Sequence, residues 1–151
     1  MPRVLVIHGP NLGLLGRREP GKYGLVTLAE IDFRLAALGA ELGVEVDCRQ
    51  FDGEGQIVTA IGHALDQVQG IVINPAGYTH TSVAIRDALA AAAELGVPAI
   101  EVHLSQPAGR EEFRHRSLVA AVCRGSISGL GPDSYLLALR GLAGLWGAGS
   151  A

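Results

Sequence analysis

Near its start the chain reads Arg3-Val-Leu-Val-Ile-His8, a short run rich in β-branched residues that is closed at once by Gly9-Pro10. A continuous apolar run of this length between turn residues is typical of a strand buried within a sheet. The segment therefore predicts a buried first strand. The rest of the fold follows from how this pattern returns along the chain.

Similar segments recur and alternate with segments of helical spacing. Further strands are expected at residues 44–50, 70–74, 98–103 and 123–128, and helices at about 27–42, 53–68, 82–95 and 133–145. Such alternation implies a parallel sheet with right-handed crossovers and helices on both faces. Five strands favour an α/β, flavodoxin-like three-layer sandwich whose five-stranded parallel sheet has the order 2-1-3-4-5.

Local signals mark some element ends. Thr27-Leu-Ala-Glu30 is a capping box that should start the first helix, and Gly43 should stop it. Residues Arg110–Arg114 suggest one further polar helical turn.

The composition is that of a globular protein. The chain has 151 residues, of which 48% are apolar and 18% charged. This length suits a single catalytic domain spanning residues 1–151, in which the Gly/Ala/Ser-rich end, 147–151, is expected to be a mobile tail.

Charge and hydropathy narrow the possible partners and location. A net charge of -3 provides no basic field for nucleic acid or an anionic membrane. No apolar run approaches the ~20 residues of a membrane span, and Val4–Ile7 is too short for a signal peptide. Cys48 and Cys123 suggest no disulfide framework, which favours a reducing compartment. The sequence thus favours a cytoplasmic protein.

Polar residues gather where the expected strands end. Asn11 follows the first strand, Asn74 and His80 follow the third, and His103 and Ser105 follow the fourth. Open α/β sheets bind ligands beyond the carboxyl ends of their strands, where the strand order reverses. We therefore expect a site near the ends of strands one and three.

The long Gly-rich loop from Gly9 to about Val26 contains Gly16-x4-Gly21-Lys22, which is close to a phosphate-binding P-loop. Tyr23 replaces the Ser or Thr that would bind magnesium, and Pro20 removes a backbone N–H from the cradle. No G-x-G-x-x-G follows a strand. The sequence therefore favours neither a nucleotide cofactor nor a dinucleotide.

A different chemistry suits the same loop. A guanidinium beside a tyrosine favours its phenolate, and Arg17 and Arg18 precede Tyr23 closely enough for the loop to fold back. Arg18 and Tyr23 could form a base that removes a proton α to a ketone. The alternative is that these are ordinary exposed residues of a surface loop.

Two histidines allow a functional and a structural interpretation. His80 lies just before a helix and could orient a substrate hydroxyl, or it could simply adjoin the helix cap. His103 is two residues from Glu101, whose carboxylate could orient the imidazole for proton donation. The alternative is a hydrogen-bonded core histidine.

The remaining candidates are weaker. Arg110 and Arg114, four residues apart, could clamp a carboxylate from one helix face or could merely pair with Glu111 and Asp87. No His, Cys and Asp set has zinc spacing, so no metal is expected. Three other histidines have no matching partner nearby and are interpreted as structural or surface residues: His8, His63 and His115.

Taken together, these segments resemble the type II 3-dehydroquinate dehydratases, or type II dehydroquinases. The matches are collinear over about residues 3–140. They are Gly9-Pro-Asn-Leu-Gly13, Leu15-Gly-Arg-Arg-Glu-Pro20, Tyr23-Gly24, Asn74-Pro75, Thr79-His-Thr-Ser82, Ile85-Arg-Asp87, Glu101-Val-His-Leu-Ser105, Arg110-Glu-Glu-Phe-Arg114, and Gly129-Leu-Gly131 with Tyr135 and Ala138-Leu139.

The resemblance implies a set of catalytic roles. Tyr23, as phenolate, would remove the axial C2 proton of 3-dehydroquinate, and Arg18 would activate it. Asn11 would hold a water or donor near the enolate oxygen. His103, oriented by Glu101, would protonate the departing C1 hydroxyl.

It also implies substrate contacts. Asn74, His80 and Arg114 would bind ring hydroxyls. Leu104 and Ser105 would receive the carboxylate. Asp87 would reach a site across a trimer interface, while Arg110 would act on the mobile active-site loop.

The implied reaction is an anti elimination of water through an enolate, giving 3-dehydroshikimate, the third step of the shikimate pathway to chorismate. It needs no metal or other cofactor, and the family forms homododecamers, each a tetramer of trimers. The rival hypotheses are a non-catalytic flavodoxin-like ligand-binding module and an assembly protein that has lost activity.

Some positions depart from the family pattern. Gln106 stands where Asn is usual, and Ala108-Gly109 stand where bulkier residues are common. Phe51-Asp52-Gly53 is atypical, and the family segment Asn-Pro-Gly reads Asn74-Pro-Ala76 here. None of these positions has a chemical role in the family pattern.

Overall fold

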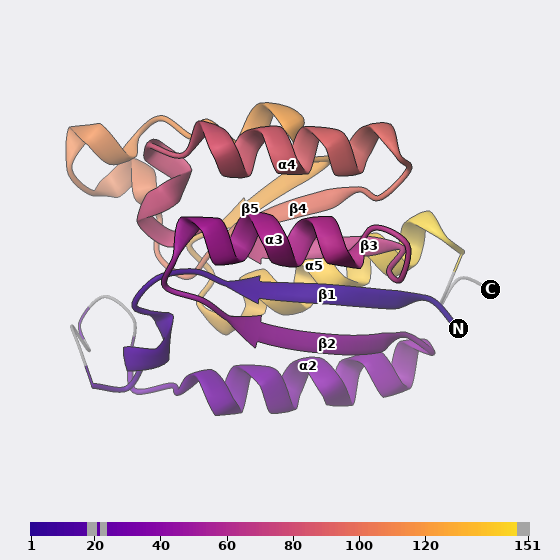
Figure 1. Cartoon of the computed structure of the whole chain (residues 1–151). Helices are drawn as coiled ribbons and strands as arrows, with labels where there is room; N and C mark the ends of the chain where they lie inside the picture. Colours follow the sequence, from indigo (N-terminus) through magenta and orange to yellow (C-terminus); the bar gives the residue numbers. More distant parts are fainter. Residues whose placement is uncertain (18–20, 22–23, 148–151) are drawn as a thin grey trace.

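The computed structural model describes residues 1–17, 21 and 24–147, which form a five-stranded sheet layered with helices (Figure 1). The strands are β1 Arg3–His8, β2 Glu45–Gln50, β3 Gly70–Asn74, β4 Ala99–His103 and β5 Gly125–Ser128. All neighbouring strands pair in parallel, in the order β2-β1-β3-β4-β5. The predicted fold class and strand order are confirmed.

The strand register aligns the carboxyl ends that matter for ligand binding. His8, the last residue of β1, lies opposite Gln50 of β2 and Asn74 of β3. On the other side of β3, Ile73 lies opposite Glu101 of β4. The loops that leave β1, β3 and β4 therefore begin at one edge of the sheet, to which the arrowheads of β1 and β2 point in Figure 1.

The helices form the two outer layers, and each packs on its own apolar core. The side chains of β1 alternate between the faces: Val4 and Val6 belong to one core cluster, and Leu5 and Ile7 to the other. Helices α2 (Leu28–Leu42) and α5 (Pro132–Leu145) cover the first cluster, and α3 (Glu54–Ala64) and α4 (Val83–Glu94) the second. Burying each large apolar side chain contributes roughly 1.5–3 kcal/mol.

The predicted helix ends agree closely with the structure, except in α3. Thr27 caps α2 by accepting a hydrogen bond from Glu30 N at 3.2 Å, and Gly43 ends the helix with φ 70°. Helix α3 stops at Ala64 rather than Val68. Val68 still donates its N–H to Ala64 O, but the chain then turns so that Gln69 N can reach Arg3 O and start β3.

The polar helical turn expected at Arg110–Arg114 is shorter in the structure, where it covers only Glu112–Arg114 as a 3-10 turn. A separate 3-10 turn, Pro107–Gly109, precedes it, and Arg110 is extended between the two turns. The carbonyl of Arg110 accepts from a ring nitrogen of His115 at 3.0 Å rather than from the backbone of a continuing helix. Arg110 and Arg114 therefore do not share a helix face.

In the described part of the chain, no helix combines the length and apolar character that crossing a membrane requires. The expected tail at 147–151 lies outside the described residues, apart from Gly147.

Thr27 offers a test of the cap of α2. We expect Thr27→Ala to lower the free energy of unfolding by about 1 kcal/mol, because the N–H of Glu30 loses its side-chain acceptor. Urea unfolding measures the change. Thr27→Ser keeps the hydroxyl and serves as the control, so an equal loss in both variants would contradict this explanation.

Candidate active site

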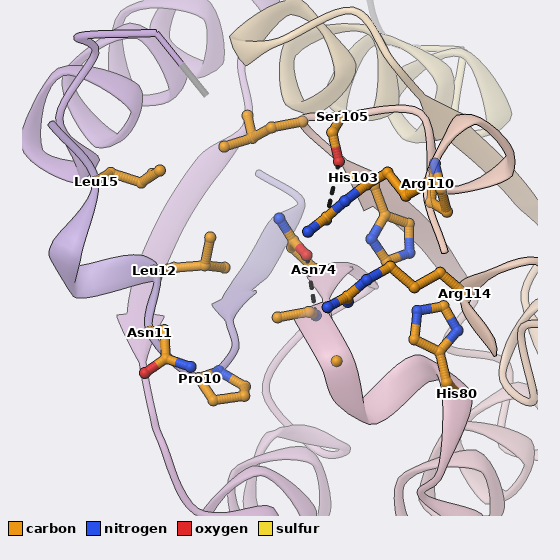
Figure 2. Close-up of a pocket in the computed structure, with 14 residues that line it drawn as sticks. Pro10, Asn11, Leu12, Leu15, Asn74, His80, His103, Ser105, Arg110 and Arg114 are labelled. Atoms are coloured by element: carbon orange, nitrogen blue, oxygen red, sulfur yellow. Dashed lines mark hydrogen bonds between the residues drawn. The ribbon is translucent and has the colours of Figure 1, made fainter. Parts of the chain in front are cut away.

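A pocket opens at the carboxyl ends of β1, β3 and β4, where the sheet predicts it (Figure 2). About 770 Å³ of space not filled by atoms lies in and in front of it, part of which is open solvent. Asn11, Leu12 and Leu15 line one side, and His80, Arg110 and Arg114 the other, with Asn74 between them. The order of strands reverses between β1 and β3, so this is the switch point of the fold.

The pocket contains a histidine held by a buried carboxylate. His103 Nε2 lies 2.6 Å from Glu101 Oε2, and Glu101 is only 2% exposed. Residues two apart on β4 point to the same face because the strand stays regular. The contact fixes one ring nitrogen of His103 and leaves Nδ1 as the nitrogen that can serve a ligand in the pocket.

Two hydroxyls complete the environment of Glu101. Thr79 Oγ1 donates to Glu101 Oε2, and Ser117 Oγ donates to Oε1 at 2.9 Å. Burial alone would raise the pKa of Glu101, but the hydrogen bonds from His103, Thr79 and Ser117 outweigh it and hold the pKa below its usual value. Glu101 is therefore an anion at neutral pH and can accept a hydrogen bond from His103 Nε2.

The opposite wall carries two arginines from the loop after β4. Arg110 Nη1 lies 3.4 Å from Ser105 Oγ, and the Arg114 guanidinium stacks 4.6 Å above the Phe113 ring. Arg114 Nε also pairs with Glu111 at 2.7 Å, so part of the alternative interpretation from the sequence is present. Both arginines nevertheless line the pocket, which gives it an anion-binding wall.

His80 lies on the same wall as the arginines. Its Nδ1 is 2.8 Å from the carbonyl oxygen of Arg116, and its ring meets Phe113 edge-on. The bond to the carbonyl requires that Nδ1 donate, so Nε2 is the ring nitrogen that a ligand can meet. Ser82, not His80, caps α4, by accepting from Ile85 N at 3.0 Å.

The loop after β1 is held by a hydrogen bond to the loop after β2. Asn11 has a left-handed backbone, φ 68°, and its N–H donates to Asp52 Oδ1 at 3.0 Å. The bonds from Asn11 and Gln50 hold the pKa of the Asp52 carboxyl below its usual range. Asp52 belongs to the segment that departs from the family pattern, and its support of Asn11 was not predicted.

The structure describes some of the remaining predicted residues and not others. Asp87 is exposed on α4, where it pairs with Arg86 at 2.9 Å. Arg18 and Tyr23, the hypothesised base, lie outside the described residues. Leu104 and Ser105 do line the pocket, directly after β4.

Sequence reasoning also missed Thr79 and Ser117. Thr79 belongs to the polar run after β3, so the sequence indicated that it lies near the site. Its hydrogen bond to Glu101 could not be inferred from the sequence. Ser117 lies between 3-10 turns, far along the chain from Glu101, and had none. Only the folding of that loop over β4 brings its hydroxyl to the carboxylate.

A separate cluster lies beneath the pocket, formed by His8, Asp32 and Cys48, whose ligand-type atoms are within 4.8 Å of one another. Sequence spacing did not indicate it, because the partners of His8 are distant in the chain, and the interpretation of His8 as a structural residue agrees with its full burial. His8 Nε2 is 2.7 Å from Asp32 Oδ1, a direct hydrogen bond that leaves no room for an ion between them. Burial and nearby Asp32 raise the pKa of the Cys48 thiol, which disfavours the thiolate needed for metal binding.

Comparisons with known proteins show which family the chain and its fold resemble. The family model described as dehydroquinase class II matches residues 2–143. A 3-dehydroquinate dehydratase from Desulforudis audaxviator is 54% identical over 138 residues, covering 91% of this chain and 90% of the relative. The crystal structure of type II dehydroquinase from Butyrivibrio crossotus has a TM-score of 0.90 at 42% identity, covering 93% of this chain and 97% of that one. The corresponding structure from Propionibacterium acnes has a TM-score of 0.89 at 48% identity, covering 95% and 97%.

The environment of Glu101 predicts a pH dependence of stability. A carboxyl whose pKa is lowered by folding stabilises the protein above its unfolded pKa, near 4.5, and this contribution disappears as the pH falls through the lower folded value. We expect Glu101→Gln to be less stable at pH 7 and to lose less stability than the unmodified protein below pH 4.5. Urea unfolding at several pH values tests this. The matched variant Glu94→Gln, at an exposed position on α4, should keep the original acid sensitivity.

Proposed function

The chain belongs to the class II dehydroquinase family, and we propose that the pocket beyond β1, β3 and β4 is where it dehydrates 3-dehydroquinate. The activity is that of a 3-dehydroquinate dehydratase, a hydro-lyase that forms 3-dehydroshikimate in the shikimate pathway. The assignment of this site rests mainly on the hydrogen bond between His103 and the buried Glu101. The family motif that leads to Tyr23 begins in the loop after β1, across the pocket from His103.

His103 is the proton donor in this proposal. A base takes the C2 proton, and the electron pair of that C–H bond forms an enolate with the C3 ketone. When the ketone re-forms, the C1–O bond breaks, and the proton from His103 Nδ1 converts the departing hydroxyl into water. Glu101 supports the donor because it holds Nε2 and carries a negative charge beside the imidazolium.

In this proposal Tyr23 is the base and Arg18 activates it. The sequence motif around these two residues, which resembles that of the family, supports both roles. The chain reaches these residues from Leu15, which lines the pocket, so the loop starts at the site it would serve. The proton that Tyr23 gains must return to His103 before the next turnover. Asn11 stands beside Leu12 at the same wall and would stabilise the enolate oxygen.

The substrate carboxylate suits the end of β4. Ser105 supplies a hydroxyl and Leu104 a backbone, while Arg110 lies against Ser105 and adds positive charge. Asn74, His80 and Arg114 line the pocket and would bind the ring hydroxyls. The reaction as proposed uses no cofactor.

We also propose that the whole chain acts as one catalytic domain in the cytoplasm and assembles as a homododecamer of four trimers. Asp87 supports the assembly, because it is exposed on α4, away from its own pocket, and could reach that of a neighbouring subunit. If Asp87 of one subunit completes the pocket of the next, activity depends on the trimer.

Activity tests the two proposed proton-transfer residues. We expect metal-free, nucleotide-free protein to convert 3-dehydroquinate, followed by near-ultraviolet absorbance of the conjugated enone. His103→Ala should lower kcat by about 10²–10⁴-fold and still exchange the C2 proton with solvent, whereas Tyr23→Phe should lose both turnover and exchange. His63→Ala, at an exposed histidine on α3, is the control. Substantial turnover by Tyr23→Phe would reject its role as base.

Assembly has its own test. We expect native mass spectrometry to give twelve copies of the 15.7 kDa chain. Asp87→Ala should reduce kcat/KM by about tenfold or more, as loss of a substrate contact does. Mixing Asp87→Ala with His103→Ala subunits should restore part of the activity if the residues serve one site from two chains. No restoration in mixed trimers would place Asp87 outside the site.

A further inference from the structure

We propose that Tyr135, His8 and Asp32 form a chain of hydrogen bonds, buried at Tyr135 and His8, that fixes how Asn74 presents its side-chain amide to the substrate. The proposal rests on the proposed function in one respect, namely that Asn74 binds substrate in the pocket. The three other residues lie outside the pocket and would be positioning residues.

The chain of contacts joins the ends of two strands to two helices on one face of the sheet. Asn74 Nδ2, at the end of β3, is 3.1 Å from the Oη atom of Tyr135 on α5. The same oxygen is 2.9 Å from Nδ1 of His8, the last residue of β1. Nε2 of His8 is 2.7 Å from Oδ1 of Asp32 on α2. Tyr135 and His8 are fully buried, and Asn74 is 3% exposed, so water does not compete for the two hydrogen bonds at Tyr135 Oη.

The chemistry of the groups sets the direction of each bond. An ionised Asp32 can only accept, so His8 Nε2 donates to it. Tyr135 Oη accepts from Asn74, and its own proton needs an acceptor, which His8 Nδ1 provides in the described part of the chain. His8 is then the neutral tautomer with its proton on Nε2. Burial raises the pKa of Tyr135, so the hydroxyl keeps the proton that this arrangement requires.

The other side of the amide leads independently to the same orientation. The N–H of Ala76 can only donate, and it lies 3.0 Å from Asn74 Oδ1. Ala76 has φ 51°, a left-handed conformation that costs roughly 1–2 kcal/mol for a residue other than glycine. The amide oxygen is therefore directed at Ala76 and the amide nitrogen at Tyr135.

The consequence concerns what Asn74 can recognise. One N–H of the amide is used by Tyr135, and the second is the group that it can offer in the pocket. Asn74 is thereby a donor, and the substrate atom it meets must be an acceptor, such as a hydroxyl lone pair. A flipped amide would offer an oxygen instead, and it would set two donors against each other at Ala76.

A double-mutant cycle tests whether Tyr135 acts through Asn74. We expect Tyr135→Phe to raise KM about tenfold, the effect of one weakened polar contact, and to change kcat by less than about threefold. In an Asn74→Ala background, Tyr135→Phe should leave KM unchanged. Equal increases in both backgrounds, or none in either, would overturn the proposal and leave Tyr135 as a core residue.

Asp32 provides a second variant if loss of the buried hydroxyl impairs folding. Asp32→Ala removes the acceptor of His8 Nε2 from a position whose side chain is 38% exposed. It should raise KM several-fold by the same coupling, again only while Asn74 is present. Glu41→Ala, at an exposed carboxylate farther along α2, is the matched control and should leave KM unchanged.

A measurement without substrate separates this proposal from the proposed function. In ¹⁵N-histidine-labelled protein at pH 7, solid-state NMR should show His8 as the neutral Nε2–H tautomer, with its signal assigned by loss in His8→Asn. An imidazolium or the Nδ1–H tautomer would overturn the chain of bonds, whatever the activity. Unmodified protein without turnover would reject the proposed function instead, and the tautomer would still test the chain.

Discussion

Parallel pairing of β1 with both β2 and β3 is the constraint on which the rest of the structure depends. Because β1 is hydrogen-bonded on both sides, the position of its last residue is set by two neighbours at once, Gln50 and Asn74. Parallel strands require a crossover after each strand, so every strand leaves the sheet at the same edge. The loops after β1, β3 and β4 then have to share one space, and that space is the pocket.

Burial of Glu101 links the stability of the fold to its chemistry. An isolated carboxylate in the interior would cost several kcal/mol, and it is tolerated only when donors surround it. Here the donors come from β4 itself, from the turn after β3 and from the loop before β5: His103, Thr79 and Ser117. Glu101, which orients the proposed proton donor, thus also connects three segments of the chain through its hydrogen bonds.

The polar side chain of Asn74 is also held by hydrogen bonds from more than one segment of the chain. Asn74 lies where β3 ends, with its oxygen used by Ala76 and its nitrogen directed at Tyr135. The left-handed backbone at Ala76 and at Asn11 is held by hydrogen bonds to neighbouring side chains. Strain of this kind persists where the surroundings over-determine a conformation, and it is common at functional sites.

The sequence by itself determined the layers, the strand order and the edge at which polar residues gather, because these follow from apolar periodicity and the rules of parallel sheets. It also indicated Glu101 with His103, since residues two apart on a regular strand share a face. It could not supply Ser117, Asp52 or the bond between His8 and Tyr135, whose partners are 16, 41 and 127 residues away in the chain. The interpretation of Arg110 and Arg114 as one helix face failed locally, because Arg110 is extended and its carbonyl accepts from the His115 ring five residues on. Local sequence patterns determine the secondary structure. Hydrogen bonds between distant segments form only after the sheet has brought those segments together, so the tertiary structure alone decided these contacts.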